Sequence, residues 1–116
     1  MFEPAHFGNV VYNQKVYTHD IYVHPSGKVE RRRKELSEIV YSTDHKVGAA
    51  EIEILLREDP DCVIIGTGYN GALRLASEAR EILREKGVVC KVYPTSRAVK
   101  EFNTCYNCSI LVHVTC

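Results

Sequence analysis

An apolar segment, a helical pattern and a second apolar segment follow one another between residues 62 and 93, and this order most limits how the chain can fold. Residues 62–66 are wholly apolar or glycine, as in a strand covered on both faces. Residues 70–86 place apolar side chains on one side of a predicted helix, and Gly87 provides its C-cap. Residues 88–93 predict another buried strand. A strand, a helix and a strand in this order form a right-handed parallel crossover, so both strands are expected in one sheet.

The rest of the chain predicts strands first, then alternating helices and strands. Turn residues separate three early segments rich in β-branched and aromatic side chains, which predict an antiparallel, hairpin-rich opening. In chain order, the remaining predicted elements are strands at 7–12, 16–24 and 28–33, helices at about 46–58 and 95–103, and a strand at 109–114. This order favours an α/β fold with a mixed sheet and helices packed over it, in a single domain spanning residues 1–116.

Composition excludes several classes of protein. The chain is 45% hydrophobic and 26% charged, which excludes a disordered or fibrous protein. Its 15 basic and 15 acidic side chains give a net charge of zero, which argues against a nucleic-acid partner. No segment stays apolar over the roughly 20 residues that a membrane span needs. The five cysteines are an odd number and no signal-peptide pattern is present, so we expect a cytoplasmic protein rather than a secreted disulfide scaffold.

Residues 66–71 read Gly-Thr-Gly-Tyr-Asn-Gly and match the pattern G-x-G-x-x-G between a predicted strand and a predicted helix. Glycines in such a loop let backbone N–H groups approach an anion. A dinucleotide site also needs a carboxylate at the end of the next strand, but that strand ends with Tyr93 and Pro94, so no cofactor is expected. Two interpretations stay open: a tight turn that needs glycine, or a pocket for a small anionic ligand. The candidate ligand-binding residues are Gly66, Thr67, Gly68, Tyr69, Asn70, Thr95, Arg33 and His45.

Cysteine and histidine residues crowd the last part of the sequence. Zinc sites use such residues at short spacings, and the pattern C-x₂-C-x₄-H-x₂-C is formed by Cys105, Cys108, His113 and Cys116. However, a buried strand over 109–114 would hold Cys108 and Cys116 on the order of 25 Å apart. The four residues are therefore weak metal candidates, and no metal is expected. A redox pair of Cys105 and Cys108 is a further alternative, and simple packing is the favoured interpretation.

One basic run, residues 31–34, lies between Glu30 and Glu35. The favoured interpretation is a solvated strand edge that discourages pairing with another chain, and the alternative is a patch for an anion or an acidic partner. Residues 42–45 read Ser-Thr-Asp-His. They are interpreted as the N-cap of the following helix rather than a catalytic triad, because triad residues converge from different segments.

Several short motifs occur in a fixed order along nearly the whole chain: Phe7-Gly8-Asn9-Val10, Tyr17-x-x-Asp20-Ile21, Arg32-Arg33-Lys34-Glu35, Ile64-Ile65-Gly66-Thr67-Gly68, Pro94-Thr95-x-x-Ala98 with Asn103, and His113-Val114-Thr115-Cys116. As a set they resemble the adipogenesis-associated Mth-domain family, which includes a mitochondrial complex I assembly factor. The resemblance implies a three-layer fold with a mixed central β-sheet, helices on one side and a small N-terminal antiparallel β layer on the other. It also implies a role in assembly or protein interaction, and a shared pocket around Gly66–Gly68, Thr95 and His45. The chain departs from the family at residues 105–108, Cys-Tyr-Asn-Cys, where members carry a Gly-Arg-Arg type of turn.

No convincing set of acid, base, nucleophile and orienting residue emerges from the sequence. We therefore expect a non-catalytic interaction or assembly-type domain with an unidentified protein partner. The alternative is a small metabolite-binding protein or enzyme whose polar contacts are Thr67, Thr95, Arg33 and His45. A thiol-redox or zinc module at the C-terminus is a weaker alternative. Strand edges near the N-terminus are also compatible with a homodimer.

Overall fold

The two strands of the predicted crossover, β6 (Cys62–Gly66) and β8 (Val89–Tyr93), pair in parallel in the computed structural model, which describes residues 1–116. Helix α3 (Ser77–Glu85) lies between them in the chain. The parallel pairing of these strands is therefore confirmed. One detail differs, because β8 is the outermost strand of its sheet and Val89 is 55% exposed, so it is an edge strand and not a buried one.

The central sheet has five strands in the order β4-β3-β9-β6-β8. Strand β9 (Cys108–Val112) pairs in parallel with β6 and antiparallel with β3 (Ile21–Val23). The antiparallel hairpin of β3 and β4 (Val29–Arg31) completes the sheet. The mixed sheet is thus confirmed, and β9 is the strand that joins its antiparallel part to its parallel part.

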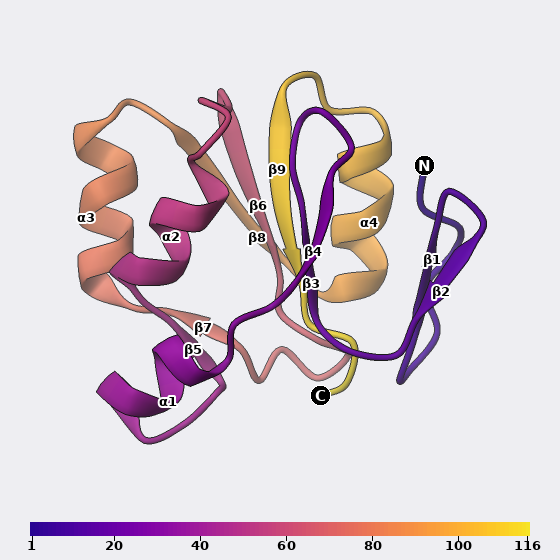
Figure 1. The fold of residues 1–116 in the computed structure, drawn as a ribbon, viewed down its shortest axis with the longest axis horizontal. Coiled ribbons are helices and arrows are strands. Elements are labelled where there is room, and N and C mark those ends of the chain that lie inside the picture. The colour runs from indigo at the N-terminus through magenta and orange to yellow at the C-terminus, as the bar shows by residue number, and fades with distance from the viewer.

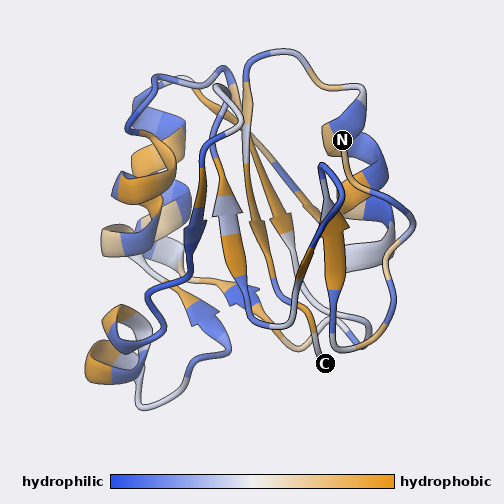
Figure 2. Ribbon diagram, turned by 45° about the vertical axis from the view of Figure 1, so that its right-hand side comes forward, coloured by the Kyte–Doolittle hydropathy of each residue, from blue (hydrophilic) through white to orange (hydrophobic).

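Two hydrophobic cores lie on the two faces of this sheet, because successive side chains of a strand point to opposite faces. In β6, Cys62 and Ile64 belong to one core, while Val63 and Ile65 belong to the other. Figure 1 shows α2 (Ala49–Leu55) and α3 covering one face, with α4 (Thr95–Asn103) and the hairpin of β1 and β2 on the other. Figure 2 shows that the strands between these layers are largely hydrophobic. The three-layer fold is confirmed, with α4 placed on the side of the small β layer.

The N-terminal part contains more elements than the sequence predicts. The predicted strand at 16–24 is wrong as a single element: β2 (Lys15–Tyr17) pairs with β1 (Val10–Tyr12), whereas β3 belongs to the central sheet. The break falls at residues 18–20, where Asp20 is buried and its carboxylate binds groups from other segments. The pattern of hydrophobic residues alone does not reveal this break between two strands.

Three short elements were not predicted at all. Helix α1 spans Glu35–Tyr41, and strands β5 (Lys46–Val47) and β7 (Arg74–Leu75) form a small parallel pair. Residues 42–45 do not cap α2, since its N-cap is Gly48 and Ser42 instead ends α1 in the left-handed conformation. None of the helices has the length and apolar character that a membrane crossing requires.

Candidate functional site

Three parallel strands end at the same edge of the sheet, and the segments that follow them meet there. Gly66 pairs with Tyr93 on one side and with Val112 on the other, so the glycine loop, the start of α4 and the segment after β9 leave the sheet side by side. Ligand sites of parallel sheets lie at this carboxyl edge. Most of the residues singled out from the sequence are at this edge.

The glycine loop binds the backbone of residues 115–116. The backbone N–H of Tyr69 donates to the carbonyl of Thr115 at 2.8 Å, and those of Asn70 and Ala72 donate to the carbonyl of Cys116 at 3.2 and 2.9 Å. The loop also does not open a helix as predicted, because β7 intervenes and α3 begins only at Ser77. These amides already have partners, so an anion would bind them only after residues 115–116 had left. Anion binding at this loop stays a prediction.

Gly68 is the position in the loop that has to be glycine. Its φ of +95° lies in the left-handed region, and a Cβ atom there would approach the Cys116 carbonyl carbon to 2.4 Å and Cδ2 of His113 to 2.7 Å. Both the backbone angle and the close approach exclude a side chain. The first of the two interpretations, a turn that needs glycine, therefore has a specific structural basis.

Thr95, a predicted site residue, is fully buried and bridges the loop to the segment after β9. Its hydroxyl accepts the N–H of Gly68 at 2.9 Å and donates to the carbonyl of His113 at 2.6 Å. Thr67 is also buried, and its hydroxyl donates to the carbonyl of Tyr93 at 3.1 Å. Both hydroxyls thus bind backbone groups of this edge and hold its three segments together.

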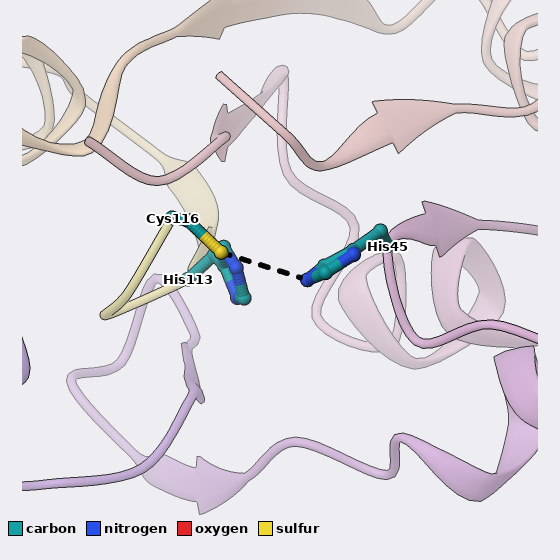
Figure 3. Close-up of side chains that lie close together, drawn as sticks. All are labelled: His45, His113 and Cys116. Carbon is teal, nitrogen blue, oxygen red and sulfur yellow. Dashed lines mark hydrogen bonds between the residues drawn. The ribbon is translucent and has the colours of Figure 1, made fainter. Parts of the chain in front are cut away.

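His45, His113 and Cys116 form a cluster beside the glycine loop (Figure 3). Nε2 of His45 lies 3.9 Å from Sγ of Cys116, and the two imidazole rings are nearly perpendicular with centroids 5.3 Å apart. His45 reaches the cluster from the segment before β5. Strand β7 fixes this segment, since the N–H of Arg74 donates to the carbonyl of His45. The predicted neighbourhood of the loop, Thr95 and His45 is thus present in the structure.

A buried charged network lies behind His113. Nδ1 of His113 is 2.8 Å from Oδ2 of Asp20, and Nη1 of Arg32 is 3.0 Å from the same oxygen. Oδ1 of Asp20 accepts the N–H of Val114 at 3.0 Å. Burial alone would raise the pKa of Asp20, but the hydrogen bond from His113, together with Val114 and Arg32, lowers it to about 2. The Asp20 carboxylate is therefore a fixed negative charge under His113.

Arg32, like Asp20, is a residue of this network that was not predicted from the sequence. It lies in the basic run interpreted as a solvated edge, which holds for Arg31 and Arg33 but not for Arg32, whose side chain is fully buried. Its remaining partner is Glu51 of α2, and the carboxylates of Glu51 and Asp20 raise the pKa of Arg32 although burial alone would lower it. Its partners come from segments 12 and 19 residues away, so no local spacing could have identified it.

Residues 2–109 match the model of a family described as a protein of unknown function, DUF498/DUF598. This chain belongs to the DUF498/DUF598 family. Its fold is similar over the full chain to the conserved hypothetical protein PH1505 from Pyrococcus horikoshii, with 34% identity, 99% of that chain covered and a TM-score of 0.93. It is also similar to a protein described as MT938, with 37% identity, full coverage of this chain, 98% of the other and a TM-score of 0.85.

A more distant structure carries the same domain type in its description. This protein from Bordetella pertussis, described as a Mth938-like domain, is 15% identical with a TM-score of 0.55, and the alignment covers 94% of this chain and 82% of that one. At this identity the likeness shows the fold alone. The chain thus shares the fold of that Mth938-like domain and belongs to the DUF498/DUF598 family.

In two cases, residues that the sequence pattern placed in one candidate site lie apart in the structure of this DUF498/DUF598 chain. Cys105 and Cys108 form a disulfide beside Cys62, so the favoured interpretation of simple packing is wrong for this pair. His113 and Cys116 lie with His45 instead, so the C-x₂-C-x₄-H-x₂-C residues do not form one zinc site. The separation follows from strand β9, which begins at Cys108 and ends at Val112, directly before His113.

Arg33 is also apart from the loop. It lines a hollow of about 430 Å³ with His19, Arg31 and Lys34, and none of the glycine-loop residues takes part in it. The edge of the sheet therefore brings together His45, Thr95 and the loop without Arg33.

Proposed function

We propose that this chain is a non-catalytic protein-interaction domain of the cytoplasm that docks a partner protein through helix α1. The observation that carries the proposal is the exposure of two β-branched side chains on this short helix: Ile39 is 80% exposed and Val40 66%. Figure 2 shows hydrophobic residues on this helix, away from the sheet. Contiguous exposed apolar surface, unlike a single exposed apolar side chain, marks sites of protein interaction.

A hollow beside these residues gives the surface its shape. It has a volume of about 330 Å³ and lies between α1 and the start of α2, lined by Leu36, Val40, Tyr41, Gly48 and Ala49 among others. A Cβ atom on Gly48 would lie 2.6 Å from the Tyr41 hydroxyl oxygen, so glycine at this position lets the tyrosine ring lie close against the start of α2. The hollow can receive one large apolar side chain of a partner.

The charges around the hollow indicate the kind of partner. Glu78 of α3 is exposed and lines the hollow. Glu35 and Glu38 of α1 are also exposed, but they line a different hollow together with Arg31 and Arg33. A second copy docked face to face would oppose these carboxylates with the same carboxylates, which disfavours self-association through this surface. We therefore propose a partner segment with large apolar side chains flanked by Lys or Arg.

The sheet edge formed by β8 is a weaker docking candidate. Val89 and Val92 of β8 are exposed there, but Lys91 occupies the middle of the strand. A second copy paired antiparallel about the centre of β8 would place Lys91 opposite Lys91, and a lysine in an edge strand discourages such pairing. The family resemblance to assembly proteins also supports an interaction role without specifying a partner.

The test uses two synthetic helical peptides with the same leucines, one carrying lysines and the other glutamates on its polar face. Fluorescence anisotropy would measure their binding to the wild-type chain, to Ile39→Ser/Val40→Ser, and to Val16→Ser as a control, since Val16 is an exposed apolar residue of β2. We expect the basic peptide to bind the wild-type chain and the control equally. Binding should weaken at least about tenfold in the double variant, because about 1.4 kcal/mol of contact free energy is lost.

Two results would overturn the proposal. One is equal binding of the basic peptide to the wild-type chain and to the double variant. The other is a dimer in sedimentation velocity that the double variant abolishes, because the occupant of the surface would then be a second copy of this chain.

A further inference from the structure

The cluster of His45, His113 and Cys116 has the ligand atoms and the spacing of a metal site. The ligand atoms of the three residues all lie within 4.8 Å of one another. Figure 3 shows Cys116 and His45 directed toward each other, with His113 beside Cys116. One thiolate and two imidazoles are soft and intermediate ligands, a set that suits zinc among the divalent metals of proteins.

Asp20 fixes which nitrogen of His113 is free to bind. The ionised carboxylate only accepts hydrogen bonds, so Nδ1 of His113, at 2.8 Å, carries the proton. In the neutral ring, Nε2 then presents its lone pair on the side of Thr115, whose hydroxyl oxygen is 3.4 Å away. Metal-binding histidines generally donate their other ring N–H to a carboxylate or carbonyl in this way. The orientation of the ring is therefore set before any ligand arrives.

The glycine loop fixes the third residue of the cluster. Two loop amides bind the carbonyl of Cys116, and Gly68 lies against its backbone. The segment after β9 is thereby ordered. Binding of a ligand to the Cys116 thiol therefore costs less conformational entropy than it would in a flexible segment. His45 is the residue of the cluster whose side chain has room to move, since 41% of its side-chain surface is exposed.

We propose that His45, His113 and Cys116 bind one divalent thiophilic metal ion of the zinc class, with a fourth coordination position left open. Zinc lies about 2.0–2.1 Å from nitrogen and about 2.3 Å from sulfur, so tetrahedral ligands are separated by roughly 3.5 Å. The 3.9 Å between Nε2 of His45 and Sγ of Cys116 is close to this value. No separation in the cluster exceeds 4.8 Å, which is about 1.3 Å more than this value, so the three side chains need to close in only slightly around an ion. Three protein ligands and an open position are typical of zinc sites that accept an exogenous ligand.

The site is independent of the docking surface proposed above. It uses residues at the carboxyl edge of the sheet, and neither Ile39 nor Val40 belongs to the cluster. The two proposals therefore stand or fall separately.

The experiment is a titration of the full, untagged, metal-free chain with Co²⁺ under reducing conditions, followed by displacement with Zn²⁺ in a calorimeter. Tetrahedral Co²⁺ absorbs intensely in the visible range, and a thiolate ligand adds a charge-transfer band in the near ultraviolet. We expect one ion per chain. The charge-transfer band should disappear in Cys116→Ser, and Co²⁺ affinity should fall at least about tenfold in His45→Ala.

Two control variants separate this site from other thiols and imidazoles. Cys105→Ser/Cys108→Ser removes the other sulfur cluster, and His6→Ala removes an exposed imidazole elsewhere. Both should bind Co²⁺ as the wild-type chain does. Loss of the signal in the double serine variant, or its persistence in Cys116→Ser, would overturn the proposal. So would a chain that binds no Co²⁺ but whose Cys116 reacts rapidly with iodoacetamide, since that result indicates a nucleophilic thiol–imidazole pair.

Discussion

Arg32 and Glu51 form a two-point ion pair in the interior of the protein. Nε of Arg32 lies 2.8 Å from Oε1 of Glu51, and Nη2 lies 3.1 Å from Oε2. Both side chains are 1% exposed or less. Because Arg32 follows β4 and Glu51 lies in α2, the pair ties a helix of one outer layer to the edge of the central sheet. The hydroxyl of Tyr22 also donates to Oε1, at 2.5 Å.

Replacing Arg32 with methionine should strongly destabilise the fold. The change leaves two buried carboxylates, Asp20 and Glu51, without their shared cation, and breaking a buried pair in this way costs about 3–5 kcal/mol of unfolding free energy. Urea denaturation of Arg32→Met and of Arg33→Met would measure it. The neighbouring Arg33 is exposed, so its replacement should change stability by less than about 0.5 kcal/mol. Equal stability of the two variants would show that the network contributes no net stability.

Acid should destabilise the protein through Asp20. The folded state lowers the pKa of this carboxyl from 3.8 to about 2, so its contribution to stability is present above pH 3.8 and is lost as the pH falls toward 2. A shift of this size corresponds to about 2 kcal/mol. Urea denaturation at several pH values between 5 and 2 would measure the slope. Asp20→Asn should reduce the dependence of the unfolding free energy on pH, whatever the substitution does to stability at neutral pH. An unchanged dependence would contradict the assignment of the acid effect to Asp20.

Gly68→Ala should weaken the hydrogen bonds between the loop and residues 115–116. A positive φ costs alanine roughly 1–2 kcal/mol, and the overlap of its Cβ with Cys116 and His113 adds about 1–3 kcal/mol. Gly87→Ala is the matched control, since Gly87 also has a positive φ, of +68°, but no atom within 4 Å of its Cβ position. Denaturation should show the larger loss for Gly68→Ala. Hydrogen exchange should also show faster exchange of the Asn70 and Ala72 amides in that variant alone.

Thr95→Val should cost stability through one lost hydroxyl. Valine keeps the shape but leaves the N–H of Gly68 and the carbonyl of His113 without their buried partner, which costs about 1–3 kcal/mol. Ser96→Ala, at an exposed position one residue further, should have almost no effect. Thermal unfolding of both variants would compare them. If Thr95→Val were as stable as the wild-type chain, the bridge between the loop and β9 would not contribute to folding.

The parallel pair of β6 and β8 could be predicted because its signal is local. A continuous apolar segment, turn residues and a helical pattern all lie within about 30 residues, as in a βαβ unit. The extent of the helix was harder to predict, because Leu73 and Ala76 continue its apolar pattern although both precede the helix, which begins at Ser77. There the tertiary pairing of β5 with β7 outweighs the helical periodicity.

The candidate site was predictable only in part. The glycine loop, Thr95 and His45 were identified from motifs, and the structure brings them together. The role of the loop was not predictable, because the carbonyls that occupy the amides of Tyr69, Asn70 and Ala72 belong to residues more than 40 positions later in the chain. Asp20 and Arg32 were not predicted for the same reason, since a buried charge is recognisable only when its partners are known.

The position of β9 in the sheet has a consequence for synthesis. Every other strand precedes β9 in the chain, yet β9 separates β3 from β6. While the ribosome is still making the preceding residues, the hairpin of β3 and β4 and the pair of β6 and β8 each present an unpaired edge where β9 will later insert. Open edges of this kind invite pairing with other chains. A nascent chain of this fold therefore stays vulnerable to aggregation until residues 108–112 emerge, however stable the finished domain is.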